Sequence, residues 1–158
     1  MDSNTLYLAA KTLHIGAFVL AVGIVACTFV TYRHFWVLYS EDAGRGIAAF
    51  RAFNRLQAAG MVSLAVVMIA GIAMLLLMDW GLLTHHWFQL KLGLVALIFL
   101  NGMTLGRAST LRLRQFLAAG GAETPEAANQ LRQKLRLFQM LQLTIYGVII
   151  IVSVFRVD

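Results

Sequence analysis

The hydrophobic residues of the chain fall into four long runs that are separated by polar, mostly arginine-rich segments. The runs cover residues 5–31, 58–78, 87–105 and 137–155. A helix needs about 20 mostly apolar residues to cross the hydrocarbon of a bilayer. A backbone in lipid must also satisfy its own hydrogen bonds, which favours helices here because no strand-like alternation is present. The pattern predicts an all-α fold: an integral membrane four-helix bundle, with one transmembrane domain over residues 1–158.

The composition supports the same class. Hydrophobic residues make up 60% of the chain and charged residues 13%, whereas soluble domains average about 45–50% and about 25%. The first run follows "MDSNTLYL", which has no basic segment, so we interpret it as a retained span rather than a cleaved signal peptide. Cys27 is the single cysteine and cannot form an internal disulfide.

The basic residues predict the orientation of the spans. Cytoplasmic loops of membrane proteins carry an excess of lysine and arginine. The two segments that follow the first and third runs hold ten of the thirteen: Arg33, Arg45, Arg51, Arg55, Arg107, Arg112, Arg114, Arg132, Lys134 and Arg136. Both termini should therefore be non-cytoplasmic, and we expect a multi-pass protein of a bacterial cytoplasmic (inner) membrane. The same asymmetry explains the net charge of +6 without a nucleic-acid partner.

The segment between the third and fourth runs has helix signals of its own. "GRASTLRLRQFLAAGG" keeps helix-forming residues up to Gly120 and Gly121, a natural helix end. "ETPEAANQLRQKLRLF" starts a new helix, with Thr124 as N-cap, Pro125 at the first position and Glu126 in the first turn. We therefore expect spans 3 and 4 to extend into a basic cytoplasmic helical hairpin, residues 106–136. Contact with lipid headgroups is its simplest role, and docking of a partner is the alternative.

Lys11 and His14 lie in "AAKTLHIGAF", at the start of the first run. His14 is about 14 Å along the predicted helix, at 1.5 Å per residue. At that depth a short imidazole does not easily reach water, whereas the longer Lys11 side chain can reach the interface. Ionisable residues within spans usually face the bundle and mark a functional site. We interpret His14 as a candidate haem axial ligand or proton-transfer group, and a neutral histidine bonded to a neighbouring helix is the alternative.

Other candidates surround this end of the predicted bundle. Lys91 lies a few residues into the third run, much as Lys11 does in the first. Met74 and Met78 lie in the outer half of the second run and could complete a methionine–histidine pair, although packing is the commoner role. His85 and His86 are in the short outer loop, where a surface role is expected.

The inner half of the predicted bundle contains a second polar set. These residues should face inward and hydrogen-bond between helices, or else line a pocket for a porphyrin or a quinone. They are Gln139, Gln142, Tyr146 and Ser153, which share one helical stripe, together with Asn101 and Thr104 of the third run.

The stretches "KTLHIGAF", "AFRAFNRLQAAG" and "HHWFQLKLGLVALIFLNG" resemble, in order and spacing, those of a family of small four-helix membrane proteins. This family is the HemJ-type protoporphyrinogen oxidase, with related groups such as the copper-resistance protein D domain. The resemblance implies haem b bound through His14, with Lys91 and Arg55 at matching family positions. The chain departs from the family pattern where it has Asn101 in place of a histidine, and "FQMLQ" in place of an Asn-Glu-Pro-like stretch.

Two hypotheses for the function follow. The first is a haem-associated, b-type redox or electron-transfer membrane protein, with His14 bound to the haem iron. In it, Lys11 and Lys91 pair with propionates and Tyr146 contributes to the lining. The second is a non-enzymatic membrane subunit or assembly factor that docks a partner through its basic cytoplasmic face. A homo-oligomer or a larger membrane complex is compatible with both. A copper-handling protein ranks last, because no Met-x-x-Met motif or Cys/His cluster is present.

Overall fold

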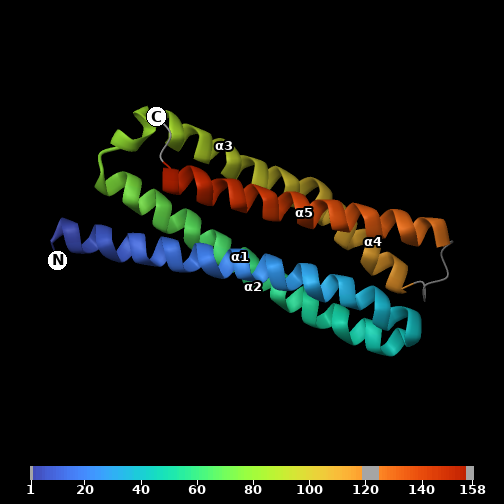
Figure 1. Cartoon of the computed structure of the whole chain (residues 1–158). Helices are drawn as coiled ribbons and strands as arrows, with labels where there is room; N and C mark the ends of the chain where they lie inside the picture. Colours follow the sequence, from blue (N-terminus) through green and yellow to red (C-terminus); the bar gives the residue numbers. More distant parts are fainter. Residues whose placement is uncertain (1, 119–124, 156–158) are drawn as a thin grey trace. The chain divides into compact units, whose positions relative to one another are not determined.

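The computed structural model describes residues 2–118 and 125–155, and every element in these residues is helical. Figure 1 shows the long helices in chain order. The helical elements along the chain are α1 (Ser3–Glu41), α2 (Ala43–Leu77), η1 (Gly81–Thr84), α3 (His86–Asn101), η2 (Gly102–Gly106), α4 (Arg107–Ala118) and α5 (Pro125–Phe155). Four helical stretches in the described part of the chain are long and apolar enough to cross a membrane. The expected all-helical membrane class is confirmed at this level.

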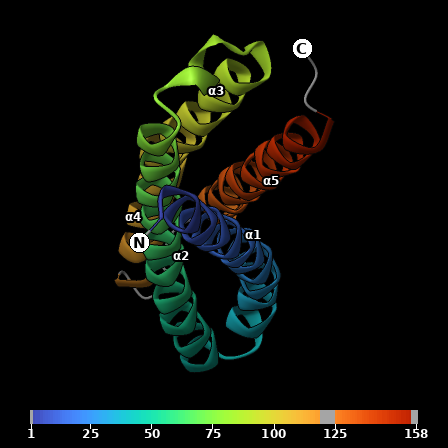
Figure 2. The same ribbon diagram turned by 90° about the vertical axis from the view of Figure 1, so that its left-hand side faces the viewer.

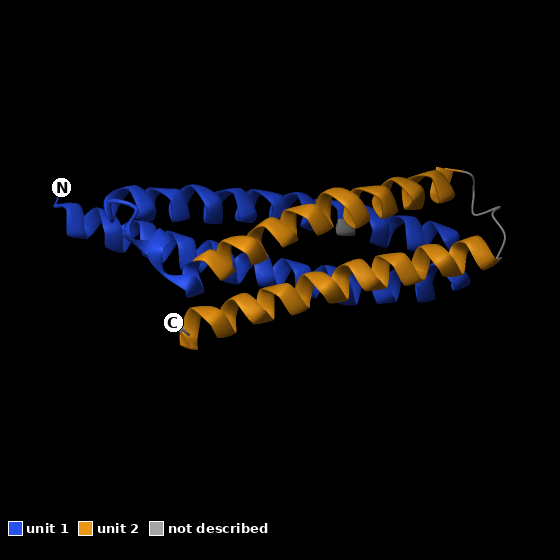
Figure 3. Cartoon of the chain, turned by 90° about the horizontal axis from the view of Figure 1, so that it is seen from above, with its two compact units in different colours: residues 1–88 blue, residues 89–158 orange. Residues whose placement is uncertain are grey.

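The chain divides into two compact units, Met1–Phe88 and Gln89–Asp158, which Figure 3 colours separately. The first unit is an antiparallel hairpin of α1 and α2 (Figure 2). The buried residues of α1 recur at intervals of three, four or seven, which is the spacing of a helix–helix seam. They are Ala17, Ala21, Thr28, Tyr32 and Phe35. The hairpin is therefore held along most of its length by one narrow stripe.

The faces away from the seam are apolar. Among the exposed side chains of this unit are Val30, Val62 and Ile69, each at least 65% exposed. In water such surfaces would be costly, at about 25 cal/mol per Å². In a bilayer the same surfaces meet acyl chains, so a seam of small and aromatic residues is enough to hold the pair together.

Both helices of the hairpin continue well past their apolar runs. The first run ends near Thr31, whereas α1 continues to Glu41, and α2 starts at Ala43 rather than near Ala58. A helix of 39 residues is about 58 Å long at 1.5 Å per residue, about twice the thickness of the hydrocarbon. Aromatic rings hold the extension together: Phe35 contacts Phe50 across the hairpin, with ring centroids 6.2 Å apart.

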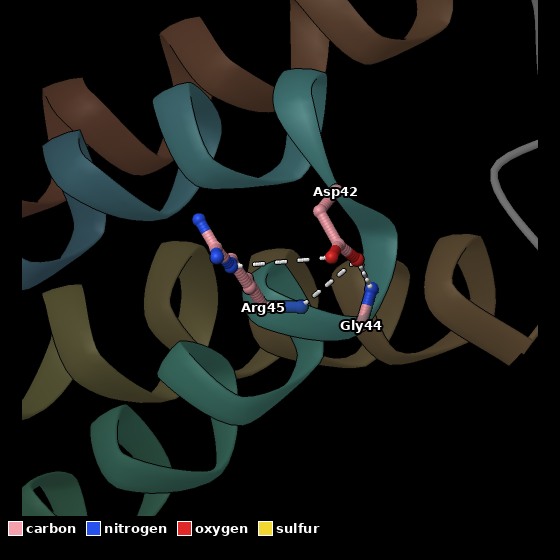
Figure 4. Close-up of polar contacts among 3 residues, drawn as sticks. All are labelled: Asp42, Gly44 and Arg45. Carbon is pink, nitrogen blue, oxygen red and sulfur yellow. Dashed lines mark hydrogen bonds and ion pairs between the residues drawn. The ribbon is translucent and has the colours of Figure 1, made fainter.

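Asp42 makes the turn between α1 and α2 (Figure 4). Its backbone is extended, with φ −152° and ψ 114°, which ends α1. Its side chain then caps α2, because one carboxylate oxygen accepts hydrogen bonds from the backbone N–H groups of Gly44 at 2.7 Å and Arg45 at 3.3 Å. The other carboxylate oxygen lies 4.0 Å from Nε of Arg45. One residue thus ends one helix and starts the next.

The second unit pairs α5 with η2 and α4. α3 passes through the π-helical turn η2 before it continues as α4: the Arg107 N–H donates to the Gly102 carbonyl, five residues back. Gly106 lies against the Phe138 ring, so closely that an added Cβ would be 2.8 Å from Phe138 Cζ. Away from this contact α3 and α5 diverge, as Figure 2 shows.

The predicted start of the last helix is confirmed. α5 begins at Pro125, with Glu126 in its first turn. Proline suits this position because the first helical N–H has no partner in the helix, and the carboxylate complements the positive end of the helix dipole. The predicted N-cap Thr124 and the predicted helix end at Gly120 and Gly121 lie outside the described residues.

Candidate functional site

His14 lies on the seam of the first unit, between Ala10 and Ala17 in the repeat of inward-facing residues, and is half-buried. Its Nδ1 atom is 2.8 Å from the backbone carbonyl oxygen of Val67 on α2. A carbonyl oxygen can only accept, so Nδ1 carries the proton and donates. In the neutral ring the lone pair is then on Nε2, and the hydrogen bond to α2 determines the orientation of the imidazole.

Gly71 makes this approach possible. A Cβ atom at Gly71 would be 3.2 Å from His14 Cε1 and 3.3 Å from Nδ1, so the glycine gives the ring room beside the α2 backbone. The Nδ1–Cε1 edge of the ring faces α2, and the Nε2–Cδ2 edge faces away from the Val67–Gly71 backbone. No porphyrin can lie between His14 and Gly71. A ligand to Nε2 must approach from the other edge of the ring.

The other candidates of the first unit lie on the same two helices or directly after α2. Lys11 is one turn from His14 on α1, and its side chain is exposed. Met74 continues the face of Val67 and Gly71 on α2 and is half-buried, while Met78 is the residue just after the end of α2 and is 40% exposed. A role of Met74 or Met78 as an axial ligand stays a prediction.

His85 lies in the connection from α2 to α3 and His86 is the first residue of α3, and both are exposed. Asp79 and Trp80 turn the chain there with positive φ angles of 47° and 60°, and each such residue costs of order 1 kcal/mol or more. The His85 and Trp87 rings lie 6.2 Å apart. No group of three or more metal-ligating side chains occurs within residues 2–118 and 125–155.

The second unit contains the polar cluster that the sequence predicts in its inner half. The Asn101 Nδ2 group donates to Gln142 Oε1 at 2.7 Å and to the Phe138 carbonyl at 3.3 Å, both on α5. Tyr146 is buried one turn further along and forms a side-chain hydrogen bond with Gln142. The predicted hydrogen bonding between the helices is therefore confirmed for Asn101 and Gln142.

Two other members of the predicted set behave differently. Thr104 donates to the Leu100 carbonyl at 2.6 Å, within its own helical stretch, and is exposed. Ser153 donates to the Ile149 carbonyl, one turn back on α5. Their expected hydrogen bonds to another helix are wrong, because a hydroxyl reaches the carbonyl one turn back on its own helix more easily than any group on a neighbour.

Two buried side-chain oxygens of this cluster are unpaired acceptors in the described part of the chain. Gln139 and Asn101 are 2% and 4% exposed, and Gln139 Oε1 and Asn101 Oδ1 have no hydrogen-bond partner in the described part of the chain. The Asn101 amide cannot gain by turning over, because its Nδ2 already donates to two oxygens. A lining role for this stripe, with Tyr146, remains a prediction, and so does a propionate contact for the half-buried Lys91.

Sequence reasoning missed three groups in these contacts. No sequence pattern marks the Val67 carbonyl, the Phe138 carbonyl or Gly106. A main-chain oxygen or a glycine becomes important only through the side chain that packs against it. Gly71 has the His14 ring beside it, unlike four other glycines of the apolar runs, Gly16, Gly23, Gly93 and Gly102. Those four have no atom within 4 Å of an added Cβ outside their own backbone.

Comparison with protein-family models gives no match for this chain, and neither the curated proteins nor the solved structures give one. The resemblance to the HemJ-type family stays a prediction. The conclusions about function therefore depend on the geometry around His14 and on the distribution of charge.

Proposed function

We propose that the protein is a haem-associated, b-type redox or electron-transfer membrane protein in which His14 is an axial ligand through Nε2. The observation that carries this proposal is the 2.8 Å contact between His14 Nδ1 and the Val67 carbonyl. Histidines that bind metals usually donate their second ring N–H to a carboxylate, a carbonyl or water, which sets the tautomer and raises the basicity of the ligating nitrogen. His14 has this arrangement within a membrane span.

The residues present are compatible with the cofactor. Neutral imidazole is a usual haem ligand, and the hydrogen bond to α2 orients the His14 ring. Lys11, one turn away on α1, would pair with a propionate near the outer surface, where a cation beside a carboxylate makes a strong hydrogen bond. Met74 and Met78 remain the sequence-based candidates for a second ligand, but they follow the α2 side that the Nδ1–Cε1 edge of His14 faces. When bound, haem b would supply reversible one-electron transfer.

A visible spectrum tests the proposal. The protein is purified in detergent from cells given ample haem precursor, and the reduced-minus-oxidised spectrum is recorded. We expect a b-type signal that is lost in His14→Gly and restored by added imidazole, which can occupy the vacated position. His34→Ala and His85→Ala are matched controls, because these histidines lie outside the apolar runs, and both should keep the signal.

Two outcomes contradict the proposal. A colourless wild-type protein is one, and a haem signal that survives in His14→Gly is the other. If the protein is colourless and His14→Ala only lowers its stability, the histidine serves helix packing. The function to pursue is then that of a non-enzymatic membrane subunit.

A further inference from the structure

We propose that the basic end of the second unit, at Arg107 and Arg136, binds the headgroup of an anionic phospholipid. Six cations lie on α4 and the first half of α5, and all are exposed: Arg107, Arg112, Arg114, Arg132, Lys134 and Arg136. Glu126 is the single acidic residue in the described parts of these stretches. The only ion pair among the described residues of the chain is that of Arg45 with Asp42. The positive charge of this surface is therefore available to an outside anion.

Arg107 and Arg136 lie at one level of the helix pair. Gly106, which precedes Arg107, packs on the ring of Phe138, two residues after Arg136. The apolar run of α3 and η2 ends at Leu105, and that of α5 starts at Leu137. At 1.5 Å per residue, Arg107 is about 3 Å and Arg136 about 1.5 Å beyond the apolar edge. The headgroup layer is about 5–7 Å thick on each side, so both backbones lie within it.

Each of the two arginines has an exposed methionine four residues below it: Met103 in η2 lies below Arg107 of α4, and Met140 lies below Arg136 on α5. Met103 precedes Arg107 by four residues and is 69% exposed, and Met140 follows Arg136 by four residues and is 43% exposed. A cation above a flexible apolar side chain matches the two parts of a phospholipid, a charged headgroup and an acyl chain. An acidic soluble protein would use the charge but leave the apolar part unused, so the geometry favours a lipid.

Arg112 and Arg114 provide the internal comparison. They carry the same charge on α4 and are exposed, but they lie about 10 Å and 13 Å beyond the apolar edge. That is past the headgroup layer. Position relative to the apolar edge, rather than total charge, should therefore decide which cations hold a bound lipid.

Lipid binding to the full chain in detergent tests the proposal. Phosphatidylglycerol, phosphatidylcholine or inorganic phosphate is titrated and bound lipid is counted by native mass spectrometry, with thermal stability as a second readout. We expect wild type to prefer phosphatidylglycerol, and inorganic phosphate to give no stabilisation. A cation near a lipid surface strengthens binding about fivefold, so Arg107→Gln with Arg136→Gln should weaken phosphatidylglycerol binding roughly thirtyfold. Arg112→Gln with Arg114→Gln should change it by less than about threefold.

Three outcomes overturn the proposal. Equal losses in the two double variants would mean that charge acts diffusely. No loss in either would leave the two arginines without a role in binding. Stabilisation by inorganic phosphate equal to that by phosphatidylglycerol would show that the acyl chain contributes nothing. The two double variants remove the same charge from exposed positions. If Arg107→Gln with Arg136→Gln unfolds the protein, phosphatidylcholine binding is lost together with phosphatidylglycerol binding. Arg107→Lys with Arg136→Lys then replaces that variant and should retain the preference for phosphatidylglycerol.

Discussion

The Asn101 Nδ2 atom donates to the Gln142 Oε1 atom across the second unit, at 2.7 Å, and both side chains are buried. An amide pair of this kind joins the third apolar run to the fourth without any charge. In an apolar environment a polar side chain that loses its partner is left unsatisfied. The pair therefore contributes both stability and register, because only one alignment of the two helices brings these amides together.

A double-mutant cycle on this pair should show coupling. Asn101→Leu leaves the Gln142 amide without its donor, Gln142→Leu leaves Asn101 with only the Phe138 carbonyl, and the double variant removes both amides. Interactions of this type in membrane proteins average about 0.6 kcal/mol and reach about 1.7 kcal/mol. Reversible unfolding in mixed micelles would measure it. Thr104→Val is the matched control because its hydrogen bond stays within its own helical stretch. Additive effects at Asn101 and Gln142 would contradict the prediction.

Enlarging Gly71 should destabilise the first unit through His14. The β-carbon of Gly71→Val would lie 3.2 Å from His14 Cε1, and the further methyl groups would push the ring from the Val67 carbonyl. Overpacking typically costs about 1–3 kcal/mol. Gly23→Val is the matched control, because no atom outside its own backbone lies within 4 Å of its added Cβ.

The thermal midpoint of each purified variant is the measurement for this prediction. Removing a glycine from a helix interior also lowers the backbone entropy of the unfolded chain, so Gly23→Val should be neutral or slightly stabilising. Equal midpoints for the two variants would show that the His14 ring yields without cost.

Gly106→Val should clash with Phe138 in the second unit, and a smaller partner should relieve the clash. An added Cβ would be 2.8 Å from Phe138 Cζ and 2.9 Å from Cε2, closer than such atoms normally approach. We expect a loss of about 1–3 kcal/mol. Phe138→Leu should restore more than half of it in the Gly106→Val background while destabilising the wild-type background. Unfolding free energies of the four proteins would measure this, and a double variant no more stable than Gly106→Val would contradict the packing.

Much of the fold could be predicted from local signals, and the contacts at the sites could not. Runs of apolar residues predict helices regardless of their neighbours, and Pro125 with Glu126 marks a helix start by local chemistry alone. The inward face of Gln139, Gln142 and Tyr146 follows from spacing. In contrast, the acceptor for His14 is a main-chain carbonyl, and any of several carbonyls on α2 could have been opposite it. Only the register of two packed helices selects Val67.

The same distinction explains the differences in helix length and regularity. An apolar run reports where lipid meets a helix, but a helix continues wherever its residues still favour it. Residues 32–41 are more polar than the run before them and remain helical, so α1 ends at Glu41 rather than near Thr31. The π-helical turn Gly102–Gly106 has no local signal beyond its two glycines, and its last residue, Gly106, lies against Phe138.

Asp42→Ala should shorten or loosen the start of α2. The substitution removes the acceptor for the N–H groups of Gly44 and Arg45 and the weak ion pair with the Arg45 side chain. Loss of an N-cap typically costs about 1 kcal/mol, whereas an exposed ion pair contributes little. Asp42→Asn separates the two effects, because asparagine caps nearly as well but carries no charge, and it should keep most of the stability. Glu41→Ala, the exposed neighbour, is the control.

Backbone hydrogen exchange at residues 43–46 is the direct measurement: exchange should accelerate in Asp42→Ala and stay near wild type in Asp42→Asn and Glu41→Ala. Equal acceleration in Asp42→Asn would assign the effect to charge rather than to capping.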